Sequence, residues 1–149
     1  MAKKNASVNQ TRRFARERVL QALYQLELSG GEASAVRSEI VTRQQMSLVD
    51  EDFFVSLYDK VAQNPGAIDK LLLPALDRPV EDLDPIERCV LRISTCEFVH
   101  HQEVPARVVI NEAIEITKRY GADQGYKYVN GVLDKLAIVL RPTEMKKSG

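Results

Sequence analysis

The sequence predicts an all-α protein of about seven helices. Its apolar residues recur at the three- and four-residue spacings that build one face of a helix. No stretch shows the alternating apolar and polar pattern of a half-buried strand. Glycine, proline and capping residues separate the apolar segments, and no internal repeat of the solenoid type is present. The 149 residues, of which 44% are apolar, suffice for one domain or two tightly packed half-domains with a buried core.

The first helix is expected over residues 11–28, where Ala15, Val19 and Leu23 belong to one apolar stripe. It ends at Ser29-Gly30-Gly31, because glycine readily adopts the left-handed conformation that closes a helix. Further helices are expected over residues 33–45, from about 49 to 63, and over 67–75, with the break between the last two at Asn64-Pro65-Gly66.

A connector over residues 77–84 contains Pro79 and is the best candidate for a boundary between sub-domains. Asp84-Pro85-Ile86-Glu87 then has the pattern of a capping box with proline at the first helical position. We expect the last three helices over residues 84–101, 105–120 and 123–141. Gly121 is expected to end the sixth helix, and Asp123 to cap the seventh.

These elements predict a single helical domain with short extensions. Residues 1–10 form a flexible basic arm, and residues 143–149 form a tail. The domain covers residues 11–142, with sub-bundles over about 11–80 and 81–142.

The formal net charge of zero conceals an uneven distribution. Residues 1–18 hold six lysines and arginines and one acid, Glu17, whereas residues 32–87 hold twelve acidic and five basic residues. Basic ends that flank an acidic middle allow one surface to bind a polyanion and another to bind a basic partner. The start is basic but has no apolar stretch, and no run approaches the roughly 18 apolar residues of a membrane span, so we expect a cytoplasmic protein.

The sequence offers little for catalysis or metal binding. Cys89 and Cys96 lie seven residues apart on one expected helix, too far apart for a disulfide, and are expected to be buried thiols. His100 and His101 form an adjacent pair with poor geometry for a metal. The glycines punctuate helices and follow no strand, so they do not form a phosphate-binding loop. We therefore expect no enzyme activity, no cofactor and no metal site.

Basic and aromatic residues favour RNA binding instead. Arg12, Arg13 and Arg16 lie near the start of the first helix, where the helix dipole prefers acids, which suggests that they serve a ligand. Around the glycine elbow after the sixth helix stand Tyr120, Lys127 and Tyr128. Tyrosines provide stacking platforms for bases, and lysines neutralise phosphates. The sequence pattern does not show whether the arginines meet this elbow.

Three segments resemble the NusB family of bacterial transcription antitermination factors. They are ARERVLQALYQLEL (15–28), LDPIERCVLRISTCEF (83–98) and PARVVINEAIEITKRYGADQGYKYVNGVLDKLA (105–137). The resemblance implies two perpendicular three-helix bundles with a shared core. It also implies binding to boxA-type single-stranded RNA together with the ribosomal protein NusE. That assembly joins RNA polymerase and other Nus factors during transcription of ribosomal RNA operons.

The resemblance also implies roles for individual residues. The residues similar to the family's RNA surface are Arg12, Arg13, Arg16, Tyr24, Tyr120, Lys127 and Tyr128. Glu87 and Arg92 resemble positions near the interface with the ribosomal protein. Two positions depart from the family pattern: Phe14 interrupts the arginine run, and Gln124 stands where some members carry an acid.

Two other interpretations stay open at this point. The same fold forms the RNA-binding part of a ribosomal RNA cytosine methyltransferase, so the chain could be a stand-alone relative of that part. It could also be a homodimeric protein-interaction module that uses the acidic middle, since some family members pair with themselves.

Overall fold

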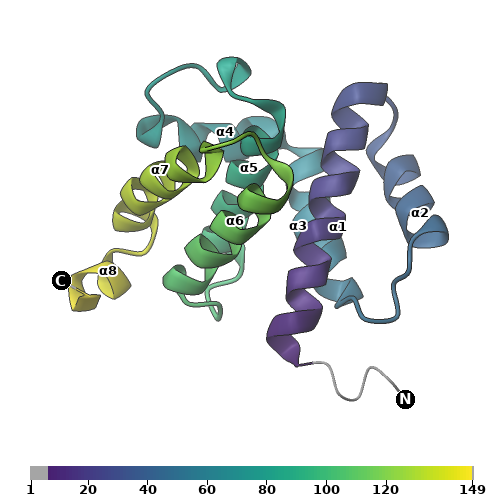
Figure 1. Ribbon diagram of the computed structural model, residues 1–149, viewed down its shortest axis with the longest axis horizontal. Coiled ribbons are helices and arrows are strands. Elements are labelled where there is room, and N and C mark those ends of the chain that lie inside the picture. Colours follow the sequence, from purple (N-terminus) through teal and green to yellow (C-terminus); the bar gives the residue numbers. More distant parts are fainter. Residues whose placement is uncertain (1–6, 149) are drawn as a thin grey trace. The chain divides into compact units, whose positions relative to one another are not determined.

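The computed structural model describes residues 7–148, which contain eight α-helices, two short 3-10 helices and no strand. The all-α prediction is therefore confirmed, with one helix more than expected (Figure 1). The additional helix, α8 (Pro142–Ser148), lies in the segment predicted as a tail. Residues 8–10 already belong to the first helix and not to the predicted arm, whereas Lys3 and Lys4 lie outside the described residues.

The chain divides into two compact units, Met1–Gln63 and Asn64–Gly149. In the first unit, α1 (Val8–Ser29), α2 (Ala33–Arg43) and α3 (Glu51–Gln63) all pack on one another. The second unit contains α4 (Pro65–Leu72), η2 (Leu73–Ala75), η3 (Val80–Asp82), α5 (Pro85–His100), α6 (Ala106–Tyr120), α7 (Gly125–Leu140) and α8. Here α5, α6 and α7 pack on one another, and α4 packs on α5. Because of that contact α4 belongs to the second unit, whereas the sequence grouped it with the first.

Helix α1 begins and ends at residues that satisfy its free backbone groups. The Ser7 hydroxyl accepts a hydrogen bond from the Gln10 backbone N–H at 3.0 Å. At the other end Gly30 adopts φ 66° and donates its N–H to the Leu26 carbonyl, as the sequence predicts. Between these caps the expected apolar stripe is buried at Ala15, Val19 and Leu23.

Helix α5 confirms the cap predicted at its start. The Asp84 carboxylate accepts hydrogen bonds from the backbone N–H groups of Ile86 and Glu87, and Pro85 occupies the first helical position. Its inner face is almost wholly enclosed, with Cys89 2% and Cys96 0% exposed. Both cysteines are buried, as predicted, and neither forms a disulfide, so they pack as small groups of the core.

The elbow between α6 and α7 agrees with the prediction in part. Gly121 ends α6, as predicted, although its φ of −87° is not left-handed. It needs to be glycine for lack of space, since a Cβ atom there would lie 2.8 Å from the Thr117 carbonyl oxygen. Asp123 does not cap α7, because the cap position is held by Gln124, whose φ is 68° and whose side chain makes no capping bond. The left-handed residue of this turn is therefore a glutamine.

Replacement of Gln124 with glycine is expected to stabilise the protein by about 0.5–1 kcal/mol. A left-handed conformation costs a residue with a Cβ atom roughly 1–2 kcal/mol, and part of this gain is offset by the greater chain entropy of unfolded glycine. Urea unfolding of Gln124→Gly beside Gln124→Ala measures the difference. The alanine variant keeps the Cβ atom and is expected to show no gain. Equal free energies for the two variants would contradict the prediction.

Helix α8 is connected to the body of the second unit by a polar network. The Arg141 guanidinium, 4% exposed, donates to the backbone carbonyls of Phe98 at 2.8 Å and His101 at 3.2 Å. It also pairs with Glu144, whose carboxylate accepts the Ala106 N–H at 2.7 Å. That hydrogen bond lowers the pKa of Glu144, with a further contribution from Arg141. The network thus links α5, α6 and α8.

None of the helices in the described part of the chain combines the length and the apolar character that crossing a membrane requires.

Candidate nucleic-acid interface

The elbow of the second unit carries three tyrosines beside basic side chains. Tyr120 is 49% exposed at the end of α6, and Tyr126 and Tyr128 are half-buried in the first turn of α7. Cations lie over all three rings: Arg119 over Tyr120 at 6.0 Å, Lys118 over Tyr126 at 4.9 Å and Arg78 over Tyr128 at 4.8 Å. A surface that pairs cations with aromatic rings provides both phosphate attraction and stacking.

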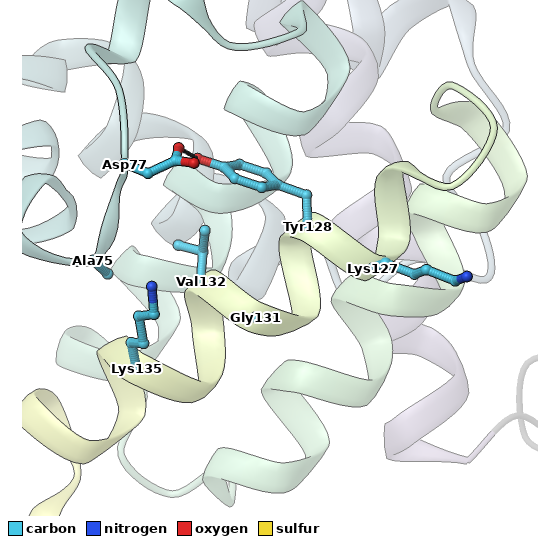
Figure 2. Close-up of a pocket in the computed structure, with 7 residues that line it drawn as sticks. All are labelled: Ala75, Asp77, Lys127, Tyr128, Gly131, Val132 and Lys135. Carbon is cyan, nitrogen blue, oxygen red and sulfur yellow. Dashed lines mark hydrogen bonds between the residues drawn. The ribbon is translucent and has the colours of Figure 1, made fainter.

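A hollow of about 220 Å³ lies beside Tyr128. Its lining residues are Ala75, Asp77, Lys127, Tyr128, Gly131, Val132 and Lys135. Figure 2 shows Val132 and the side-chain-free Gly131 along the face of α7, with Lys135 rising one turn later toward Ala75. The Lys127 side chain points away from the other lining residues (Figure 2). Neither lysine amine forms a hydrogen bond or an ion pair with another described residue, so both amines are available to an anion.

The connector residues Asp77 and Arg78 hold the Tyr128 side chain. The Tyr128 hydroxyl donates to the Asp77 carboxylate at 2.9 Å, across 51 residues of sequence (Figure 2). The same carboxylate accepts from Arg78 Nε at 2.8 Å and Nη2 at 3.1 Å. Hydrogen bonds from Arg78 and then Tyr128 lower the pKa of Asp77 to about 2, so it is charged at neutral pH. Burial, and then the bond to Asp77, raise the pKa of Tyr128, which keeps its proton.

The predicted arginines of α1 differ in their exposure. Arg13 is exposed, Arg12 is half-buried and Arg16 is only 3% exposed. The guanidinium groups of Arg12 and Arg16 lie over the Phe53 ring of α3, at 4.4 and 5.1 Å. Arg12 also forms an ion pair with Asp50 at 3.4 Å. Arg12 and Arg16 therefore contribute to the packing of the first unit, and their contact with a ligand stays a prediction.

The other residues predicted to bind RNA lie in both units. Tyr24 is half-buried on α1, and Phe14, one of the departures from the family pattern, is half-buried as well. Tyr120, Lys127 and Tyr128 are brought together at the elbow of the second unit. A meeting between the arginines and this elbow stays a prediction.

The two residues expected near a protein partner are both engaged within the second unit. Arg92 forms a two-pronged ion pair with Asp69 of α4, at 2.8 and 2.9 Å. Glu87 stands against Gly125, where a Cβ atom would lie 2.5 Å from its Oε2. Burial and then the Asp84 charge raise the pKa of Glu87, against a smaller opposite effect of Arg78. Their predicted contact with a partner stays a prediction.

Sequence reasoning missed Asp77, Arg78 and Lys135 as members of this surface. Asp77 and Arg78 lie in the connector, where no periodicity indicates which way a side chain points. Lys135 lies seven residues after Tyr128, two turns along the same side of α7, and this spacing could have identified it. For Asp77 and Arg78, the pattern that could have indicated a functional site is an acidic residue next to a basic one in a connector.

Two observations concern metal ions and small molecules as ligands of this surface. No group of three or more histidines, cysteines, aspartates or glutamates is placed to hold a metal ion within residues 7–148. The hollow beside Tyr128 is smaller than the roughly 300–1,000 Å³ of typical small-molecule sites. Its charged and aromatic lining therefore fits part of a polyanion better than a separate small substrate.

Comparison with known proteins identifies the family. The NusB family model matches residues 13–137. The transcription antitermination protein NusB of Xanthomonas axonopodis pv. citri is 46% identical over 135 residues, which cover 91% of this chain and 85% of that protein. The structure is similar to NusB of T. maritima, with a TM-score of 0.73 and 34% identity over 85% of this chain and 89% of that chain.

A second structural comparison supports the fold alone. The structure of antitermination factors NusB and NusE in complex with double-stranded RNA contains a chain with a TM-score of 0.73 and 23% identity. The match covers 87% of this chain and 97% of that one. The family model and the sequence identities, however, go beyond the fold and confirm the resemblance in the sequence. The chain belongs to the NusB family of transcription antitermination proteins, which are not enzymes.

Proposed function

We propose that this protein binds boxA-type single-stranded RNA together with the ribosomal protein NusE. In the cytoplasm it would join the RNA polymerase elongation complex with other Nus factors and support processive transcription of ribosomal RNA operons. The observation that carries the proposal is the clustering of three cation–tyrosine pairs and two unpaired lysines around the α6–α7 elbow. A related structure that contains NusB, NusE and double-stranded RNA supports the pairing of these ligands.

The surface has the properties that single-stranded RNA requires. Lysine and arginine supply affinity for phosphate that does not depend on sequence. Exposed tyrosines such as Tyr120 add stacking, worth roughly 1–3 kcal/mol per base on replacement by alanine. A homodimer, or a protein-interaction module that binds no RNA, would not require this combination of residues.

The proposal is tested by fluorescence anisotropy titration of a boxA-like RNA and a scrambled RNA of equal length. Each RNA is titrated with the protein alone and with NusE present. We expect tighter binding of the boxA-like RNA, with a larger preference when NusE is present. Equal weak binding of both RNAs in the presence of NusE would overturn the proposal in favour of the protein-interaction module.

Replacement of Arg13 with alanine is expected to weaken RNA binding and to reduce the slope of log affinity against log salt by about one. Arg13 is exposed on the first turns of α1, where its guanidinium can reach a phosphate, so its loss removes that contact. The matched control is Arg43→Ala, since Arg43 is a 74% exposed arginine of the same unit. If Arg13→Ala and Arg43→Ala give the same slope, Arg13 does not contact RNA.

Arg16→Ala is also expected to weaken RNA binding, but Arg16 is buried against Phe53. Its thermal unfolding must therefore be measured beside its RNA affinity. Arg13 is exposed, so with the same unfolding measurement Arg13→Ala is the better test of whether the start of α1 binds RNA.

A further inference from the structure

The Asp77 carboxylate lies between two groups of the RNA-binding surface and nearly exhausts its hydrogen-bonding capacity on them. Its Oδ1 accepts from both Arg78 Nε and the Tyr128 hydroxyl, and its Oδ2 accepts from Arg78 Nη2. A carboxylate has about four acceptor sites, so three of them are occupied. Asp77 therefore fixes Arg78 and Tyr128 relative to each other and is poorly placed to read a base by itself.

Arg78 retains donors for an outside ligand. A guanidinium carries five N–H groups, and Asp77 takes two of them. The remaining three have no acceptor in the part of the chain that the structure describes. The Arg78 side chain is 48% exposed, so these donors are open to solvent. A guanidinium with free parallel donors matches the oxygens of a phosphate.

The position of Arg78 also changes what Tyr128 can do. The guanidinium carbon lies over the Tyr128 ring, 4.8 Å from its centre, and so occupies ring surface on which a base would otherwise stack. The hydroxyl of the same ring is bonded to Asp77. Tyr128 therefore contacts Arg78 through its ring face and, by way of Asp77, through its hydroxyl. Tyr120 is the more exposed ring at this elbow.

We propose that Arg78 contacts an RNA phosphate, and that Asp77 and Tyr128 are positioning residues that hold its guanidinium in one place for the preferred RNA. This proposal rests on the proposed function of RNA binding. It extends the binding surface from α7 onto the connector between η2 and η3. An exposed ion pair between neighbouring residues contributes little to folding stability, so stability does not account for this arrangement.

The role of Asp77 is to set specificity rather than affinity. Its charge lowers the general attraction of Arg78 for any polyanion, while its two hydrogen bonds keep the guanidinium where one bound RNA conformation presents a phosphate. Without Asp77 the arginine is more mobile and its charge is unopposed, so phosphates of any RNA can reach it. Discrimination between two RNAs is a difference between two binding free energies. It decreases when the more weakly bound RNA gains more affinity than the preferred one.

The test measures affinity for boxA-like and scrambled RNA, with NusE present, across a salt series. Arg78→Ala is expected to bind the boxA-like RNA about fivefold more weakly at 0.1 M salt. One phosphate contact contributes about 0.7 to the salt slope on a single strand, which is about fivefold between 0.1 and 1 M. Arg107→Ala is the matched control, because Arg107 is an exposed arginine of the same unit, about 20 Å along α6 from Tyr120.

Asp77→Ala distinguishes the positioning of the Arg78 guanidinium from the effect of its charge. It is expected to reduce the ratio of scrambled to boxA-like dissociation constants by up to about fivefold, the contribution of the one positioned contact. Tyr128→Phe keeps the ring and every charge but removes the hydroxyl that Asp77 holds, and it is expected to lower the same ratio by a smaller factor. A residue with only a structural role would leave this ratio unchanged.

Each outcome decides one part of the proposal. Equal affinities and salt slopes for Arg78→Ala and Arg107→Ala would overturn the phosphate contact. An Asp77→Ala protein whose affinity changes by the same factor for both RNAs would overturn the positioning role. In both cases the unmodified protein still prefers the boxA-like RNA, so the proposed function survives. Its own failure is recognised separately, by an unmodified protein without that preference.

Discussion

Replacement of Phe53 with alanine is expected to lower the free energy of unfolding by about 3–5 kcal/mol. The Phe53 side chain is 3% exposed on α3, and its removal leaves a cavity in the first unit. The loss extends beyond apolar contact, because the ring also carries the guanidinium groups of Arg12 and Arg16 at 4.4 and 5.1 Å. Urea unfolding followed by circular dichroism measures the change.

Phe53→Leu is the control that distinguishes the cost of a cavity from the loss of the aromatic ring. Leucine fills most of the space, so its cost is expected to be about 1.5 kcal/mol or less, while the aromatic face beneath the arginines is lost. The leucine variant is folded enough for RNA titration, and it shows whether Arg12 and Arg16 depend on the ring for their positions. A loss below about 1 kcal/mol in Phe53→Ala would mean that the site collapses without a cavity.

Arg141→Ala is expected to destabilise the protein by about 3 kcal/mol. The 4% exposed guanidinium donates to the carbonyl oxygens of Phe98 and His101, so its removal takes a donor from the buried Phe98 carbonyl, while the His101 carbonyl still accepts the Val104 N–H at 3.0 Å. Glu144 loses its cationic partner at the same time. A hydrogen bond to a charged group contributes about 1.5–3 kcal/mol, and the bond to Phe98 is the one whose loss leaves a buried acceptor without Arg141.

The controls for this prediction preserve parts of the network. Arg141→Lys keeps the charge but not the planar set of donors, so it is expected to recover only part of the stability. Lys146→Ala removes an exposed cation from α8 and is expected to change the free energy of unfolding by less than about 0.5 kcal/mol. If Arg141→Ala were as stable as Lys146→Ala, water would have to satisfy the carbonyl of Phe98.

Most helices could be predicted from the sequence because their apolar stripes repeat over several turns. The cap at Asp84 and the left-handed Gly30 were also predictable, since each is a local interaction within a few residues. Helix α8 was missed because Pro142 was interpreted as a terminator of α7. Proline is equally suited to the first position of a new helix, and this is where it lies.

The candidate site was less predictable because its contacts are distant in sequence. The burial of Arg16 depends on Phe53, 37 positions later, and periodicity along α1 contains no information about that ring. The hydrogen bond from Tyr128 to Asp77 likewise spans 51 residues and joins a helix to a connector. The residue types of the surface could be predicted, but the cations that cover each ring could not.

The hydrogen bond between the Ala106 N–H and Glu144 has a consequence for the order in which the molecule is completed during synthesis. Pro105 precedes α6 and offers no side chain to cap it, so the acceptor comes from 38 residues further along the chain. Ribosomes add about 5–20 residues per second, so α6 waits about 2–8 s after Ala106 is made before Glu144 exists. During that interval the Ala106 N–H lacks its Glu144 acceptor, and the second unit becomes complete only after α8 has been translated.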